Sequence, residues 1–231
     1  MKLLKILLVA IFSISLIACG NDSKYNEQSK AKQNEKNEEK TNNDKLNVKD
    51  KTLIAYFTYG ENANLSDDVD SVTSASIQKY NNHLTGNTGV IAYMISEKID
   101  ADIFSIKTSD AYPDSYEATI DQAQDENNDG YRPALSSVID NFNEYDTIFI
   151  GFPNWWYDMP MAMYSFFDEY DFSGKTIIPF NTSGGSGFSD AINTIKELEP
   201  NATIHDGLSV DDSDVMDADG LVSDWLNALN Y

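Results

Sequence analysis

Two tryptophans follow a short apolar segment in the middle of the chain. Residues 147–151 are rich in β-branched and aromatic side chains, which predicts a buried strand, and Gly-Phe-Pro interrupts this run. Trp155 and Trp156 come next, at the carboxyl end of the predicted strand, where open α/β sheets bind ligands. Two indole rings at the carboxyl end of this strand predict that the ligand is flat and aromatic. Packing in the core or at its rim is the alternative for any such Trp pair.

Small and hydroxyl residues gather in three further segments. Residues 58–60 (Thr-Tyr-Gly) follow the first predicted strand, and residues 86–88 (Gly-Asn-Thr) stand where a helix is expected to begin. Backbone N–H groups and hydroxyls at a helix start bind phosphate without any lysine or arginine. Residues 181–187 (Asn-Thr-Ser-Gly-Gly-Ser-Gly) follow another strand, and their N–H groups can approach a planar ligand closely. A capped turn and a loop leading into a helix are the alternatives.

The elements that must position these loops alternate along the chain. Strands that alternate with helices predict an α/β fold with a doubly wound parallel five-stranded sheet. Apolar runs predict strands at 52–58, 102–106, 147–151, 175–180 and, weakly, 202–204. Helical spacing or composition predicts helices at 90–99, 114–128, 161–170, 189–198 and 214–229, with a further helical turn at 135–139.

The first residues predict export and a lipid anchor. Two lysines precede an apolar run that ends at residue 18, and this run is too short to span a membrane but fits a secretory signal at 1–18. Cys19, the only cysteine, follows Leu-Ile-Ala in a pattern that resembles the bacterial lipobox. The resemblance implies a lipidated Cys19, with acyl groups such as palmitate, on the extracytoplasmic face of the cell membrane. A simple secretory signal with a coincidental cysteine is the alternative.

Composition divides the remaining chain into a tether and one domain. Residues 19–51 contain few apolar side chains and interleaved lysines and glutamates, which predicts a disordered, near-neutral tether. Residues 52–231 are long enough for one domain with a proper core. They carry almost all of the net charge of -22, which argues against nucleic acid and anionic lipid as partners. An acidic surface suits a basic redox partner, and solubility alone is the alternative.

Taken together, the three loops resemble those of the flavodoxin family over about residues 52–229. Residues 56–58 with 86–88 are similar to the family's phosphate loop, 151–156 to the loop beside the flavin ring, and 182–187 to the third loop. The resemblance implies FMN as cofactor and a flavodoxin-like three-layer α/β/α fold with strand order 2-1-3-4-5. The residues that it implies for FMN binding are Thr58, Tyr59, Gly86, Asn87, Thr88, Pro153, Asn154, Trp155, Trp156, Thr182, Ser183, Gly184 and Gly185.

The resemblance also assigns parts of the cofactor to these residues. Thr58 and residues 87–88 would hold the phosphate, residues 153–156 would line the isoalloxazine, and the backbones of Gly184 and Gly185 would meet its pyrimidine edge. The chain departs from the family at about residues 60–85, an acidic insertion that divides the phosphate loop. A structureless loop of this length is uncommon in a compact domain, so we expect it to fold back and bring Thr58 to residues 87–88.

The function implied is electron transfer by a membrane-tethered FMN protein. Stacked aromatic rings and nearby negative charge would lower the potential of the flavin, and the redox partner would be an unidentified protein or small acceptor. An NAD(P)H-dependent quinone reductase and a cofactor-free binding lipoprotein are the alternatives. No residue is predicted to be catalytic or to bind metal, because no sequence pattern pairs His83 or His205 with a catalytic acid or nucleophile and the carboxylates show no metal-ligand spacing.

Overall fold

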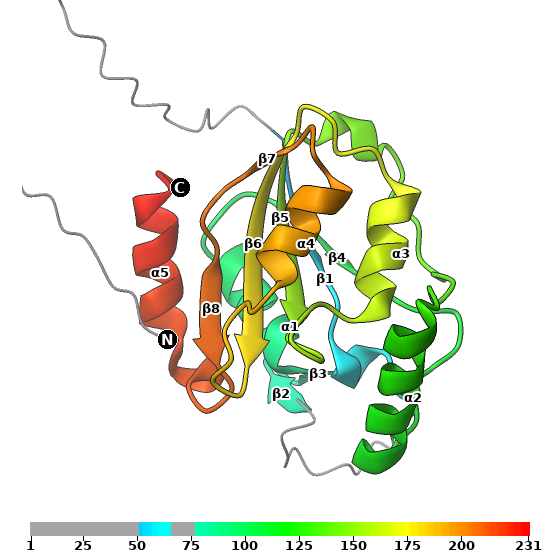
Figure 1. Ribbon diagram of the computed structural model, residues 1–231. Helices are drawn as coiled ribbons and strands as arrows, with labels where there is room; N and C mark the ends of the chain where they lie inside the picture. Colours follow the sequence, from blue (N-terminus) through cyan, green and yellow to red (C-terminus); the bar gives the residue numbers. More distant parts are fainter. Residues whose placement is uncertain (1–50, 66–76) are drawn as a thin grey trace, which may run out of the picture. The chain divides into compact units, whose positions relative to one another are not determined.

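A parallel sheet forms the middle layer of the domain (Figure 1). The computed structural model describes residues 51–65 and 77–231, so the predicted signal segment, Cys19 and nearly all of the tether lie outside the described residues. The strands run in the order β4-β1-β5-β6-β7, and β8 also pairs with β6. Their bounds are β1 (Thr52–Tyr56), β4 (Asp102–Ser105), β5 (Thr147–Pro153), β6 (Thr176–Ser183), β7 (Thr203–Ile204) and β8 (Leu208–Asp211).

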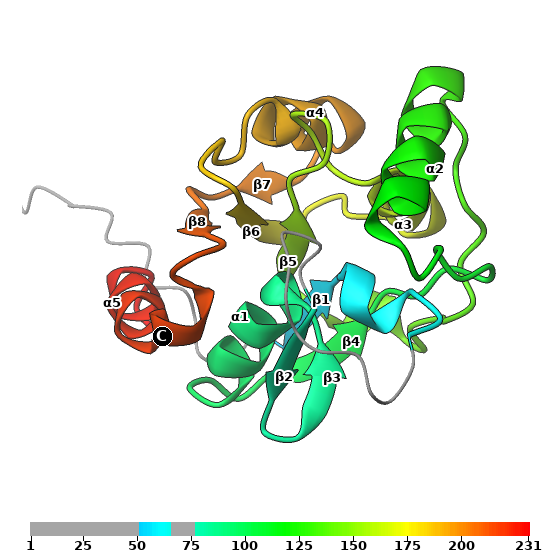
Figure 2. The same cartoon turned by 90° about the horizontal axis from the view of Figure 1, so that it is seen from below.

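All neighbours in this sheet are parallel, and β7 and β8 are two parts of one interrupted fifth strand. With those two parts counted together, the order is 2-1-3-4-5, which confirms the predicted doubly wound topology. Helices cover both faces, as the view along the strands shows (Figure 2). They are α1 (Asn87–Ser96), α2 (Tyr116–Asp129), α3 (Met161–Glu169), α4 (Ala191–Leu198) and α5 (Asp219–Ala228).

Each central strand is buried on both faces, which explains why the sequence shows apolar runs there and no alternation. Along β1, Leu53 and Ala55 face the layer of α3 and α4, whereas Ile54 and Tyr56 face α1 and α5. This alternation divides the core into two clusters, one on each side of the sheet. Because neighbouring strands are parallel, the loops after β1, β5 and β6 meet at one edge of the sheet.

The fifth strand is longer than predicted and contains a bulge. Between its two pairings with β6 it contributes residues 205–207, whereas β6 contributes only residues 178–179. Pro179 has no N–H to donate to a ladder, and a Cβ at Gly207 would lie 2.4 Å from the Pro179 carbonyl oxygen. The glycine thus lets the extra residue pass close to β6, and the strand resumes as β8.

One predicted element is wrong. Residues 135–139 form no helical turn, because the backbone N–H of Ser136 donates to the carbonyl oxygen of Lys107 at 2.8 Å and ties the segment to the chain beyond β4. The turn lies later, as the 3-10 helix η2 (Phe142–Glu144). The expected last helix is also divided, into a 3-10 helix η3 (Val215–Asp217) and α5.

The insertion has structure of its own where it is described. It begins with the 3-10 helix η1 (Tyr59–Glu61) and ends with an antiparallel hairpin of β2 (Gln78–Tyr80) and β3 (His83–Thr85). Asn81 and Asn82 make the hairpin turn with φ of 48° and 66°, the left-handed conformation that asparagine tolerates well. The hairpin packs on α1, where Tyr80 and His83 stack on the ring of Tyr93.

Glu199, at the end of α4, gives the fold a specific pH dependence. Burial and the nearby carboxylates of Asp171 and Asp168 raise the pKa of Glu199 to about 7. The folded state therefore holds this proton more tightly than the unfolded state, and stability falls as the pH rises from about 5 to about 7. We expect Glu199→Gln to raise the free energy of unfolding at pH 8 by about 1 kcal/mol, a value reduced for solvent screening, with little effect at pH 5.

Urea unfolding at the two pH values measures this difference. Glu197→Gln on the exposed side of the same helix is the matched control, because it removes one carboxylate from the same helix end. An equal gain from both substitutions would attribute the effect to net charge and not to the surroundings of Glu199.

Candidate functional site

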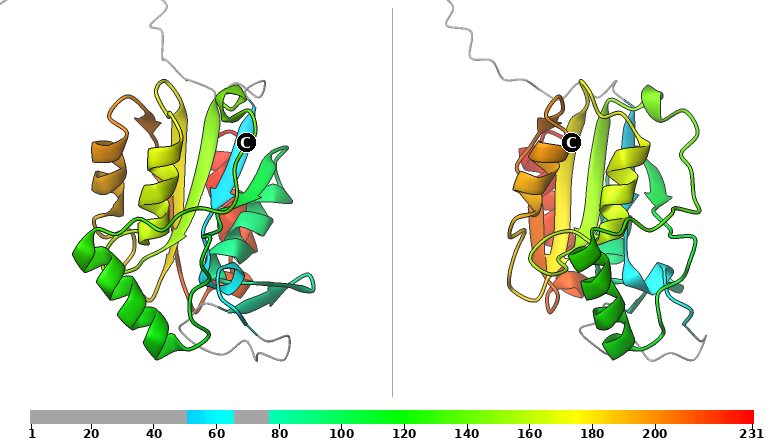
Figure 3. Two further views of the ribbon diagram at one scale, coloured as in Figure 1. Left: turned by 90° about the vertical axis from the view of Figure 1, so that its right-hand side faces the viewer. Right: turned by 45° about the vertical axis from the view of Figure 1, so that its right-hand side comes forward.

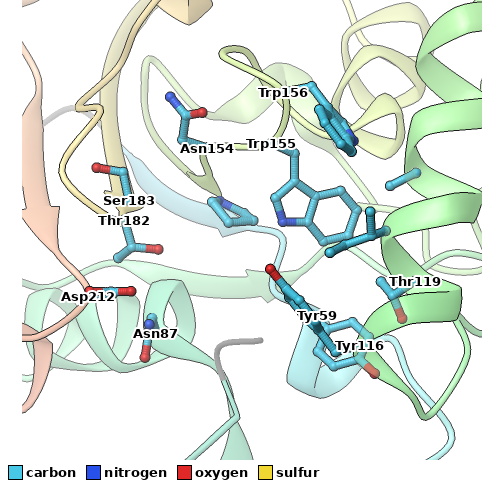
Figure 4. A pocket seen from close by; sticks show the side chains of 14 residues that line it. Tyr59, Asn87, Tyr116, Thr119, Asn154, Trp155, Trp156, Thr182, Ser183 and Asp212 are labelled. Atoms are coloured by element: carbon cyan, nitrogen blue, oxygen red, sulfur yellow. The ribbon is translucent and has the colours of Figure 1, made fainter. Parts of the chain in front are cut away.

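A pocket of about 230 Å³ opens at the carboxyl ends of β1, β5 and β6 (Figure 4). Parallel strands deliver their following loops to this edge of the sheet, which is why segments far apart in sequence meet there. On the side opposite β6, α2 borders the pocket, and Figure 3 shows this helix at the end of the domain to which the strand arrows point. The lining residues are Tyr59, Asn87, Tyr116, Thr119, Ile120, Ala123, Pro153, Asn154, Trp155, Trp156, Thr182, Ser183, Gly184 and Asp212.

Trp155 is held in place by two buried aromatic rings. Its indole meets Phe57 and Tyr112 edge-on, with ring centroids 5.6 Å and 5.5 Å apart. Tyr112 is itself fixed, because its hydroxyl donates to the buried carboxylate of Glu126 on α2 at 2.9 Å. The pocket therefore presents a pre-oriented aromatic surface, which is the arrangement that favours binding of a flat ring.

The next two residues form a strained turn. Trp155 and Asp158 exchange backbone hydrogen bonds of 2.9 Å and 3.0 Å around Trp156 and Tyr157, whose φ values are 53° and 65°. Two positive φ values define a type I′ turn, which favours Asn and Gly and costs bulky residues roughly 1 kcal/mol or more each. Trp156 is 41% exposed and Tyr157 is 70% exposed. The turn thus holds two large, exposed aromatic side chains, of which Trp156 lines the pocket.

The loop after β6 is fastened to the loop after β5. The backbone N–H of Asn154 donates to the carbonyl oxygen of Thr182 at 2.9 Å, and its side-chain amide donates to the carbonyl oxygen of Gly187 at 2.8 Å. Ser183 closes the loop from within, since its Oγ accepts the N–H of Gly187 at 2.9 Å. Gly185 has a φ of 93°, a conformation that only glycine adopts readily. Both loops are therefore rigid relative to each other.

The start of α1 offers unused hydrogen-bond donors. Its N-cap is Gly86, which makes no side-chain cap, and within the described residues the N–H groups of residues 87–89 have no acceptor. The Thr88 hydroxyl lies 2.8 Å from that of Thr182, so the first turn of α1 contacts the end of β6. The amide oxygen of Asn87 accepts from Gln78 of the hairpin at 2.9 Å. Free N–H groups and the helix dipole make this an anion-binding end.

The two described ends of the insertion lie in contact at Gly60 and Thr85. A Cβ at Gly60 would lie 1.9 Å from the carbonyl oxygen of Thr85, which only glycine permits. Glu61 locks this junction, because its Oε1 accepts the hydroxyls of Tyr56 and Thr85 at 2.9 Å and 2.6 Å, and its Oε2 accepts the hydroxyl of Ser105 at 2.6 Å. Burial and this carboxylate raise the pKa of Tyr56, which keeps the hydroxyl protonated as a donor.

The pocket carries negative and no positive charge. None of the residues that line it is a lysine or arginine, and Asp212 contributes a half-buried carboxyl group. Burial and the adjacent carboxyl of Asp211 raise the pKa of Asp212. The pKa of Asp211 is lowered, because Ser213 donates to it from its hydroxyl at 2.8 Å and its backbone N–H at 3.2 Å. The first proton taken up by the pair therefore goes to Asp212.

The structure brings most of the predicted binding residues to this pocket. Four do not line it: Thr58, Thr88 and Gly86 lie behind its wall, and Gly185 lies beside Asp211. Sequence analysis missed Asp212 and four residues of α2. Those four are Tyr116, Thr119, Ile120 and Ala123, whose spacing of three, one and three residues is that of one helix face, and this pattern was the signal available in an otherwise polar segment.

Comparison with known protein families identifies the chain. A flavodoxin family model matches residues 78–229, from the hairpin through α5. The chain belongs to the flavodoxin family. A comparison with curated proteins gives no match. Within the described residues, this flavodoxin has no helix long and apolar enough to cross a bilayer and no group of His, Cys, Asp and Glu that could hold a metal ion.

Solved structures share the fold of this flavodoxin. A candidate flavoprotein from Bacteroides uniformis ATCC 8492 is 27% identical, with 77% of this chain and 98% of that chain covered and a TM-score of 0.59. One from Bacteroides eggerthii DSM 20697 is 24% identical, with 79% and 99% covered and a TM-score of 0.59. A flavoprotein in complex with FMN from Lactobacillus acidophilus NCFM is 21% identical, with 73% and 97% covered and a TM-score of 0.53.

The strained turn of this flavodoxin allows a direct test. We expect Tyr157→Gly to raise the free energy of unfolding by about 0.5–1 kcal/mol, because it relieves a positive φ and removes a largely exposed side chain. Chemical denaturation measures the change. Tyr131→Gly is the matched control, since Tyr131 is 55% exposed and has no positive φ, and there glycine should destabilise the fold. Destabilisation by both substitutions would show that the turn is not strained.

Proposed function

We propose that this protein binds FMN and transfers electrons on the outer face of the cell membrane, to which lipidated Cys19 anchors it. The observation that carries the proposal is the meeting, in one pocket, of an uncapped helix start and a fixed aromatic wall. The first suits a phosphate and the second suits a flat ring.

The residues present fit such a cofactor. At one end, the N–H groups of residues 87–89 lack acceptors within the described part of the chain and can donate to phosphate oxygens. At the other end, Trp155 and Pro153 offer flat apolar surfaces, and the fastened loops after β5 and β6 leave Gly184 open to a ring edge. A Cβ on Gly184 would lie 3.6 Å from Oδ2 of Asp212, an ordinary contact, and would meet no atom closer than that.

FMN, when bound, supplies the chemistry by accepting and releasing one or two electrons. The protein residues bind, orient and exclude water. Trp155 and Trp156 line the ring side of the pocket, and the net charge of -22 disfavours extra negative charge on the ring. This environment supports a low reduction potential. An acidic surface also suits a basic protein partner.

Exposed aromatic side chains on α2 and in the turn after β5 favour reduction of a small acceptor as a second candidate function. Tyr116, Trp156 and Tyr157 are all at least 41% exposed, and the first two line the pocket. A planar, uncharged molecule such as a quinone could stack among these rings, with NAD(P)H as the electron donor. A cofactor-free binding lipoprotein is the remaining alternative, and loss of flavin binding would favour it.

Flavin titration tests the proposal. Adding FMN to the purified full-length chain should quench tryptophan emission, and Trp155→Leu should weaken binding about three- to tenfold through loss of ring packing. Trp225→Phe is the control, because Trp225 packs against Phe149 on the opposite face of the sheet and its removal should leave the affinity unchanged. No binding at micromolar FMN would contradict the proposal.

The proposed anchor has its own test. Cys19→Ser should abolish incorporation of radiolabelled palmitate and move the protein from the membrane fraction to the soluble fraction or the medium. Ser15→Ala within the same signal is the control and should leave both unchanged. Membrane association of Cys19→Ser equal to that of the wild type would contradict lipid anchoring.

A further inference from the structure

Asp212 occupies an unexpected place for a pocket that takes a phosphate ester. It lines the same pocket as Asn87, the first residue of α1, and Figure 4 shows Asp212, Asn87 and Thr182 on one side, with Tyr59 and Trp155 across from them. Two contacts join the segments that carry these residues. The backbone N–H of Asp212 donates to the carbonyl oxygen of Ser183 at 2.9 Å, and the hydroxyl of Thr182 contacts that of Thr88 in the first turn of α1.

No cation offsets this carboxyl group. The residues that line the pocket include no lysine or arginine, so the positive field at this end comes only from the N–H groups and dipole of α1. A helix start contributes roughly half an elementary charge, whereas a doubly ionised phosphate carries about two negative charges. An ionised carboxylate on the same side of the pocket as the start of α1 opposes this attraction.

We propose that Asp212 is a specificity-determining residue that makes the pocket discriminate between flavins by the charge of their phosphate. It disfavours the dianion and leaves binding of the uncharged riboflavin unaffected. The inference rests on the proposed flavin site and adds to it the charge state of the ligand that the site accepts. The affinities for riboflavin and for singly ionised FMN, relative to that for doubly ionised FMN, are then higher than they would be without the Asp212 carboxylate.

The groups around Asp212 give the discrimination a defined pH dependence. Asp211 is the titratable neighbour that faces it, and it stays ionised because Ser213 donates two hydrogen bonds to it. The first turn of α1 contributes no titratable side chain, and the loop after β6 contributes only Asp190, whose backbone N–H donates to the carbonyl oxygen of Tyr157. Tyr59, across the pocket, donates its hydroxyl to the carbonyl oxygen of Pro113 at 2.6 Å, and Glu61, beyond the first turn of α1, accepts hydrogen bonds from three hydroxyls. Lowering the pH protonates Asp212 and removes one charge from the phosphate, so the discrimination fades.

The test compares FMN with riboflavin on the full-length protein and on Asp212→Asn, which keeps the shape of the side chain. At pH 8 and low salt, the substitution should tighten FMN binding about tenfold and change riboflavin binding less than about twofold, as followed by flavin fluorescence. The tenfold gain should shrink at pH 5.5. Asp217→Asn on η3, an exposed carboxylate outside the pocket, is the matched control and should change neither affinity.

The outcomes separate this inference from the proposed function. Equal changes for FMN and riboflavin would place Asp212 beside the ring and overturn the inference, as would an equal effect of Asp217→Asn. Flavin binding that is insensitive to Asp212→Asn would overturn the inference alone. Failure of both flavins to bind to wild type and variant would overturn the proposed function together with the inference.

Discussion

The site depends on a closed junction at the end of β1. The phosphate loop of this chain is divided by an insertion, and yet α1 must begin beside the strand that precedes the insertion. Glu61 meets this constraint, because its carboxylate accepts hydrogen bonds from hydroxyl groups of β1, of the hairpin that ends the insertion and of β4. Gly60 completes the closure by allowing the backbone of Thr85 to approach within a distance that no side chain permits. The start of α1 therefore keeps its place beside β1 despite the insertion.

The aromatic wall depends on the same closure. Phe57, just before the junction, meets the indole of Trp155 edge-on, and Tyr112 meets it from another side. Tyr112 in turn binds Glu126 of α2, so the helix that borders the pocket and the ring that faces the ligand position are fixed together. Binding energy is then not needed to order these groups, which favours affinity.

The sequence predicted the alternating strands and helices, because buried parallel strands leave a local signal, whereas the sheet order and most of the pocket residues came from the resemblance to the flavodoxin family. The rest depended on contacts between distant residues. The bulge arises where Pro179 of β6 meets Gly207 of the fifth strand, and neither residue alone predicts it. The stripe of α2 is visible only once the helix is known to border the pocket. In the sequence, Asp212 is one of many acidic residues, and only its backbone hydrogen bond to Ser183 in the folded chain distinguishes it.

The bulge also ties the chemistry of the pocket to the length of the chain. Side chains alternate between the two faces of a strand, so one residue more or fewer exchanges which of two neighbours faces a given side. Asp211 ends β8, the strand segment after the bulge, and Asp212 follows it, so a single-codon deletion within residues 205–207 would draw the next residue of the chain into the position of Asp212. Insertions and deletions in a remote part of the fifth strand are thus a route by which relatives of this protein could change the charge of their ligand site while every residue of the three binding loops stays the same.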